Sequence, residues 1–126
     1  PMSVIQESKN LGDLLKYEAP NLYSRDQVVV ASGQNLALGA VVGRVTTSGK
    51  IKVLSPAATD GTEVAIGVLA GDINASSSDR DDAVLITRHA LVASHALVWP
   101  ASITNAQKTT AIAQLEARGV LIRTAA

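Results

Sequence analysis

Short apolar runs separated by polar turns fill the chain from residue 27 to its end. Their lengths, and the valines and isoleucines within them, are typical of strands. Ser48-Gly49 predicts a hairpin turn between two runs, residues 32–35 a second turn, and residues 71–82 a long polar loop. The predicted strands are residues 28–31, 39–46, 50–54, 63–70, 83–87, 90–98 and 120–122.

A single helix is predicted near the C-terminus, beginning after Thr104. Thr104 and Gln107 form a Thr-x-x-Gln pair, which is the pattern of a capping box at a helix start. Gly119 suits the left-handed position that ends a helix, and Arg118 suits the negative end of its dipole. The expected fold class is therefore mainly β with one short C-terminal helix.

The first 26 residues do not share the β pattern. Leu11, Leu14 and Leu15 have the spacing of one helical turn, and Pro20 would end such a helix. Both tyrosines of the chain lie here, although the segment has few apolar residues of its own. We expect residues 1–26 to be an N-terminal arm that is mobile until it meets a partner, and residues 27–126 to be one β-rich domain.

Composition restricts how the core is built. The 126 residues are 47% hydrophobic but only 2% aromatic, with no phenylalanine. The core must therefore consist of Val, Ile, Leu and Ala, which bury less area each than aromatic side chains. Contacts between subunits would add the burial that one small chain lacks, and this favours an oligomer.

Charge and cysteine content exclude several classes of protein. Eleven basic and eleven acidic residues give a net charge of zero, without the basic surplus of nucleic-acid binders. No cysteine is present, which rules out disulfides and thiolate metal sites. Residues 89–107 contain no Asp, Glu, Lys or Arg, but polar residues interrupt them, so we expect no membrane span.

The two histidines do not indicate a catalytic or metal site. On one straight strand, His89 and His95 would lie about 20 Å apart, too far to bind one ion. Ser94 and His95 are neighbours and would point to opposite faces of a strand, so they do not form a nucleophile and its base. We expect ordinary strand or rim histidines.

The remaining candidate sites are equally weak. Asp79, Asp81 and Asp82 form an acidic run, but the glycine and distal glutamate of a calcium loop are missing. Gly39 and Gly43 precede no Lys-Ser/Thr pair and open no helix, which excludes a phosphate-binding loop. The sequence therefore predicts no metal, no cofactor and no enzymatic activity.

Two blocks of sequence stand out by their order and spacing. The later block is Leu-Val-Trp-Pro at residues 97–100, followed by a polar link at 101–103, the predicted helix and the terminal strand. The earlier block is Thr-Asp-Gly at residues 59–61, followed by the apolar residues 64–70. In this combination, residues 30–126 resemble the head decoration proteins of lambda-type tailed phages.

The resemblance implies a fold and a function. It implies a β-clip-like bent ribbon that closes into a partial barrel, preceded by a flexible N-terminal arm. It also implies homotrimers on the outer surface of the virion, bound to the major capsid protein at threefold and quasi-threefold positions of the expanded head. The protein would pass through the host cytoplasm during assembly, and would contact neither nucleic acid nor membrane directly.

Candidate contact residues follow from the same comparison. The family's arm commonly adds a strand to the shell, and the adhesive residues of this arm are Leu14, Leu15, Tyr17, Leu22 and Tyr23. Trp99 is the only tryptophan, and Pro100 ends its strand, so this pair is a candidate interface anchor.

Two other functions remain open at this point. The first is a trimeric β-clip enzyme, such as a dUTPase-like nucleotide hydrolase, which would need a water-activating carboxylate in a phosphate-binding motif. The second is a small adaptor that binds a host protein.

Overall fold

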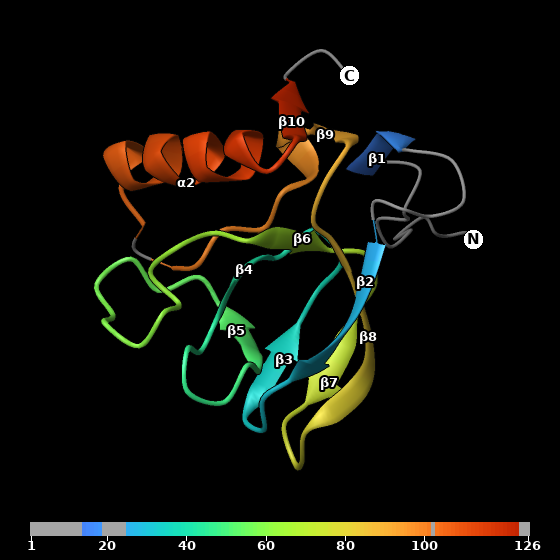
Figure 1. Ribbon diagram of the computed structural model, residues 1–126, viewed down its shortest axis with the longest axis vertical. Coiled ribbons are helices and arrows are strands. Elements are labelled where there is room, and N and C mark those ends of the chain that lie inside the picture. Colours follow the sequence, from blue (N-terminus) through green and yellow to red (C-terminus); the bar gives the residue numbers. More distant parts are fainter. Residues whose placement is uncertain (1–13, 19–24, 102, 124–126) are drawn as a thin grey trace, which may run out of the picture.

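The structure, a computed structural model, describes residues 14–18, 25–101 and 103–123. A closed five-stranded barrel lies at its centre, with its strands in the order β2-β5-β4-β6-β8 and β8 paired to β2 (Figure 1). The bounds of these strands are β2 Arg25–Val30, β5 Ile51–Val53, β4 Val41–Arg44, β6 Gly67–Leu69 and β8 Arg80–Ile86.

A three-stranded sheet with the order β1-β9-β10 packs beside the helix α2, beyond one end of the barrel (Figure 1). In it, β1 runs antiparallel and β10 parallel to the central β9. A two-stranded ribbon of β3 and β7 lies at the other end of the molecule. The bounds are β1 Leu15–Glu18, β9 Ala90–Ala93, α2 Asn105–Ala117, β10 Val120–Arg123, β3 Gln34–Leu36 and β7 Ile73–Ala75, with a short 3-10 helix, η2, at Ser94–Ala96.

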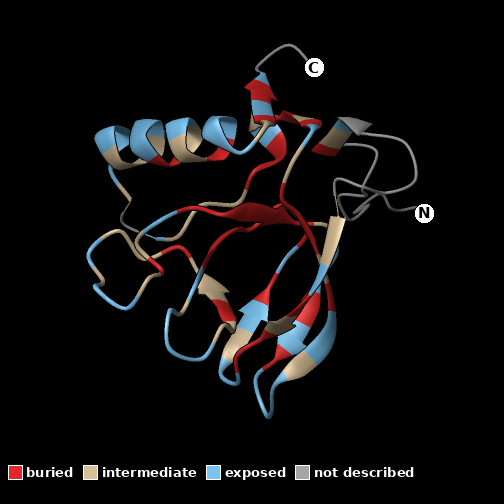
Figure 2. Cartoon of the chain, in the orientation of Figure 1, coloured by how far each residue is buried: buried red, intermediate tan, exposed pale blue. Residues whose placement is uncertain are grey.

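Two aliphatic clusters make up the core (Figure 2). One fills the barrel and the ribbon, and includes Val30, Ile51 and Leu85. The other joins the barrel to the sheet and the helix, and includes Leu14 and Leu115, both fully buried. The core is thus built from small aliphatic side chains, as the composition requires.

Two glycines allow barrel strands to approach neighbouring backbone closely, in a loop in one case and in another strand in the other. A Cβ on Gly43 of β4 would lie 2.6 Å from the Cα of Thr62. A Cβ on Gly67 of β6 would lie 2.7 Å from the carbonyl oxygen of Ile86. Any larger residue would force backbone apart at these points, so glycine is required for packing rather than for an unusual dihedral angle.

The prediction of a mainly β chain with one C-terminal helix is confirmed. Thr104 Oγ1 accepts from the Gln107 backbone N–H at 3.1 Å, and Gln107 Oε1 accepts from the Thr104 N–H at 2.9 Å. Gly119 has a φ of 91°, the left-handed conformation expected after the helix. The barrel is closed, where the resemblance implied a partial barrel.

Several strand boundaries differ from the prediction. The expected loop 71–82 contains β7 and the start of β8, and the expected turn 32–35 contains the start of β3, because these polar stretches pair with each other over long range. The expected strand 63–70 is reduced to β6. The expected strand 90–98 ends at Ala93, where η2 begins.

The predicted boundary of the arm at residue 26 also differs from the structure. β2 begins at Arg25, and β1 pairs with β9 inside the predicted arm. The pairing register shifts between Leu15 and Tyr17, so β1 has no regular alternation that a sequence pattern would reveal. The expected helical face included Leu15, which lies in β1. Residues 1–13 and 19–24 lie outside the described residues.

Candidate functional site

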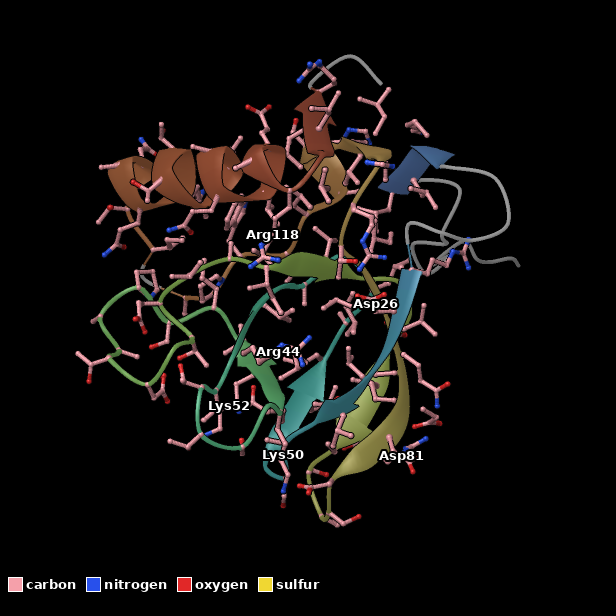
Figure 3. All side chains as sticks on the ribbon, in the orientation of Figure 1. Asp26, Arg44, Lys50, Lys52, Asp81 and Arg118 are labelled. Atoms are coloured by element: carbon pink, nitrogen blue, oxygen red, sulfur yellow. The ribbon has the colours of Figure 1, made fainter. Side chains whose placement is uncertain are left out.

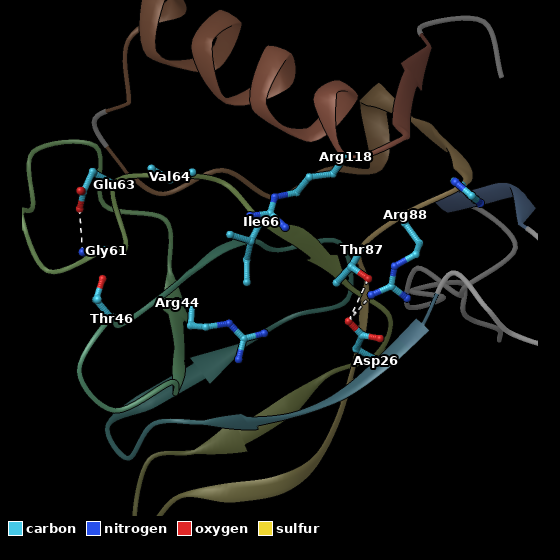
Figure 4. A pocket seen from close by; sticks show the side chains of 11 residues that line it. Asp26, Arg44, Thr46, Gly61, Glu63, Val64, Ile66, Thr87, Arg88 and Arg118 are labelled. Atoms are coloured by element: carbon cyan, nitrogen blue, oxygen red, sulfur yellow. Dashed lines mark hydrogen bonds and ion pairs between the residues drawn. The ribbon is translucent and has the colours of Figure 1, made fainter.

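A cleft opens between the barrel and the C-terminal end of α2 (Figure 4). Its volume is about 760 Å³. The barrel contributes one wall, the segment that follows β8 a second, and the loop before β6 a third. The lining residues are Asp26, Arg44, Thr46, Gly61, Glu63, Val64, Ile66, Thr87, Arg88, His89 and Arg118.

Three arginines make the cleft cationic. Arg44 leaves the end of β4 and donates to the carbonyl of Gly49 at 2.9 Å. Arg118 caps α2 and is exposed, and its guanidinium makes no hydrogen bond or ion pair with the described residues. Figure 4 shows the side chains of Arg44 and Arg118 reaching from opposite walls into the same space. Arg88 instead faces Asp26.

An ion pair closes one end of the cleft. Arg88 Nη2 lies 2.7 Å from Asp26 Oδ2, and Thr87 Oγ1 donates to the same oxygen at 3.1 Å. The Arg88 hydrogen bond is the largest cause of a lowered pKa at Asp26; Thr87 and the charge of Arg44 act in the same direction, against partial desolvation. The pair ties the start of β2 to the segment after β8.

The Thr-Asp-Gly block at residues 59–61 shapes the opposite wall. Gly61 has a φ of 108°, and a Cβ there would collide with the Arg44 carbonyl and the Thr46 hydroxyl. Asp60 accepts from the Thr62 hydroxyl at 2.6 Å and from its N–H at 3.1 Å, and these bonds lower the pKa of Asp60. Glu63 accepts from the Gly61 N–H at 2.9 Å. The block therefore builds a rigid turn against β4.

The candidate anchor Trp99-Pro100 is half-buried. Trp99 packs against the cluster between the barrel and the helix. Backbone bonds of 2.8 Å and 3.1 Å tie Val98 to Gly39 and Val41, so the chain's own backbone pairs with the residue just before this anchor. Pro100 lines a groove of about 370 Å³ that runs along β3. Trp99 thus packs partly against the chain's own core, next in sequence to Pro100.

The arm candidates fall into three groups. Leu14 is fully buried in the core and Leu15 is half-buried against it, so Leu14 stabilises the fold and offers no surface to a partner. This corrects its expected role, because the arm's apolar residues were assumed to lack a partner within the chain. Tyr17 lies in β1, at the register opposite Leu91. Leu22 and Tyr23 lie outside the described residues.

Two of the three acidic candidates, Asp79 and Asp82, form ion pairs. Asp79 forms an ion pair with Lys50 at 2.6 Å, and Asp82 one with Arg80 at 2.7 Å. His89, with a φ of 49°, interrupts the chain between β8 and β9, so the two histidines do not share the straight strand on which their separation was predicted. In the part of the chain that the structure describes, no group of three or more acidic or histidine side chains is placed to hold a metal ion.

Sequence reasoning missed the cleft. Arg118 was interpreted only as a helix-end cation, and Arg44 and Asp26 carried no pattern at all. The available signal was the Thr-Asp-Gly block, since its last residue, Gly61, lines the cleft together with Glu63 and Val64, which lie two and three positions further on. That block indicated a protein family but did not indicate where a cleft would lie.

Comparison with protein families identifies a family for this chain. The family model described as "Bacteriophage lambda head decoration protein D" matches residues 4–120. No curated protein matches the chain. Within the described residues, no helix is long and apolar enough to cross a membrane.

Proposed function

The chain belongs to the bacteriophage lambda head decoration protein D family, and this membership supports a role in phage capsid decoration. We propose that it binds the expanded head as trimers. The trimers occupy threefold and quasi-threefold positions and stabilise the shell against the pressure of packaged DNA. The observation that carries this proposal is the family match over residues 4–120, almost the whole chain.

The three-stranded sheet β1-β9-β10 is suited to bind the capsid shell, because it is open at both edges among the described strands. Of the strands described, β1 and β10 are the outer strands of β1-β9-β10, and each has one edge without a partner strand. An added strand from a capsid subunit would bond to such an edge through its backbone. Leu121 on β10 is 39% exposed and supplies an apolar contact there. The barrel strands have no such edge.

The arm completes this contact. It enters the sheet through β1, so a partner that binds residues 1–13 is held next to the sheet edge. Leu15, Tyr17, Leu22 and Tyr23 remain the proposed contact residues, with Leu14 anchoring the segment in the core. Pro100, together with the neighbouring Trp99, is the proposed anchor of a second contact.

No catalysis is needed for this role. A protein that binds only the expanded shell shifts the equilibrium toward that shell by its differential affinity. Three linked copies multiply the effect, since the second and third contacts form at high effective concentration. The proposed partner is the major capsid protein, on the outside of the virion, after assembly in the host cytoplasm; nucleic acid and membrane are not contacted and no cofactor is required.

Mixing purified protein with undecorated shells tests the proposal. We expect threefold density on expanded shells by electron cryomicroscopy, and none on unexpanded shells. Absence of binding to expanded shells of the phage that encodes the protein would contradict it. Hydrolysis of dUTP by the same preparation would favour the enzyme instead.

A further inference from the structure

Two guanidinium groups of the cleft, those of Arg44 and Arg118, form no ion pair with the described residues, although the charge of Arg44 also acts on Asp26. The Arg44 guanidinium donates to the Gly49 carbonyl, and the Arg118 guanidinium makes no hydrogen bond or ion pair with the described residues, so neither is bonded to a carboxylate. Asp26 is already paired with Arg88, and Glu63 is held by the Gly61 N–H. Two guanidinium groups that share one space are arranged to bind an anion, and a carboxylate suits them because it accepts two parallel hydrogen bonds from a guanidinium.

The cleft also has an apolar lip. Val64 is 38% exposed and is one of two large hydrophobic residues noted as exposed in the described part of the chain. Ile66, below it, is buried. A lip of this kind beside paired cations fits a folded protein surface, which offers a carboxylate set among apolar atoms, better than it fits a small free anion.

The chain carries one carboxylate that would complement this cleft. Among the carboxylates whose side chains the structure describes, only that of Asp81 makes no hydrogen bond or ion pair. Asp81 lies near Arg80, but Arg80 is held by Asp82 through two bonds of 3.1 and 2.7 Å. The Asp81 backbone is fixed by Gln27, whose side chain donates to its carbonyl at 2.9 Å. The carboxylate is thus presented to solvent from a rigid strand.

The arginines of the cleft and the Asp81 carboxylate lie on different parts of the molecule. Figure 3 shows Asp81 on β8 near the β7 end, and Arg118 at the helix end. One chain therefore cannot satisfy its own cleft. A contact between two different surfaces of identical chains is heterologous, and such contacts generate a closed ring when the rotation between copies is a simple fraction of a turn.

We propose that the cleft receives the Asp81 region of β8 from a second copy of this chain, with Arg44 and Arg118 binding the Asp81 carboxylate and Val64 covering the contact. The proposal rests on the trimer proposed above, whose protomer contact it specifies. Three such head-to-tail contacts close the ring and leave no unfilled cleft.

Charge reversal tests the contact. Arg118→Glu and Asp81→Arg should each weaken the trimer by about tenfold or more in dissociation constant, measured by sedimentation. The double variant should recover most of this loss because the pair is restored with opposite polarity. Lys108→Glu is the matched control: it makes the same charge change on the same helix outside the cleft, and should leave the trimer intact. Unchanged trimers in both single variants, or a monomeric parent protein, would overturn the inference.

Cross-linking gives a second measurement that does not depend on weakened assembly. The chain contains no cysteine, so Arg118→Cys and Asp81→Cys introduce unique sites. With a short bis-maleimide, each single variant alone should give little product, a mixture of the two should give dimers, and the double variant should give covalent trimers and nothing larger. Dimers from a single variant would contradict the head-to-tail contact. Shell binding is scored in parallel: if the parent protein binds shells but the cross-links fail, the inference is wrong and the proposed function stands.

Discussion

The barrel and the β1-β9-β10 sheet differ in whether the edges of their strands are paired. In the barrel every strand has two neighbours, because β8 pairs with β2 and closes the ring. In the sheet the described residues leave β1 and β10 each with one neighbour, at the end of the molecule where the arm joins (Figure 1). An unpaired edge is an aggregation hazard unless it is covered or used. The difference teaches that, among the described strands, those of the sheet and not those of the barrel have edges able to pair with a strand of another chain.

The two regions are nevertheless joined through a shared core. Val68 and Ile86 of the barrel strands belong to the same cluster as Leu14 and Leu115. A substitution in the sheet that alters this cluster therefore lowers the stability of the whole domain, whereas a substitution on the exposed edge of the sheet does not. The predictions below use that distinction.

The largest effect is expected at the barrel closure. Gly67→Ala places a Cβ against the Ile86 carbonyl and should cost more than about 3 kcal/mol of unfolding free energy, since backbone must move. Gly71→Ala, a nearby glycine whose Cβ would meet nothing within 4 Å, should change stability by less than about 0.5 kcal/mol. Denaturant unfolding measures both, and equal effects would show that the close approach is absent.

The next largest loss of unfolding free energy is expected for Leu14→Ala. Because Leu14 is fully buried, its truncation should cost about 3 kcal/mol, with cavity formation included. Leu121→Ala, on the exposed edge of β10, should cost less than about 1 kcal/mol. If Leu14→Ala unfolds at the same denaturant concentration as the parent, β1 is not part of the folded domain and the whole arm is independent of it.

The helix cap should contribute a smaller amount to the free energy of unfolding. Thr104→Ala removes the side chain that accepts from the Gln107 N–H and should cost about 1 kcal/mol. Thr104→Ser keeps the hydroxyl and serves as the control. A thermal melt that does not separate the two variants would mean that α2 is held by packing alone.

The smallest effect concerns pH. The pKa of Asp26 is lowered by Arg88, so the pair stabilises the native state above the unfolded-state pKa of about 4 and loses this effect as pH falls through the lowered native value. Because both side chains are about one-third exposed, Asp26→Asn should cost only about 0.5–1 kcal/mol near pH 7. The difference from the parent protein should vanish in acid. A constant difference from pH 7 to pH 2 would assign the loss to packing instead.

Local signals in the sequence predict local structure well in this chain. The capping box at Thr104 and the left-handed Gly119 lie where expected, because neighbouring residues alone determine a helix end. β7 was missed because its three residues lie within a polar stretch and form a strand only through pairing with β3, some 40 positions away. The cleft was missed for the same reason: Arg44 and Arg118 meet only after the barrel and helix have packed. Burial of Leu14 likewise depends on a core that its own segment does not reveal.

Hydrogen exchange tests the central claim most directly. Amide protection is compared between the free protein and the same protein bound to expanded shells. The account predicts new protection along β1 and β10, where shell strands would add, and unchanged protection in the barrel strands. New protection confined to the barrel, with β1 and β10 unaffected, would contradict the assignment of the open sheet as the shell-binding surface.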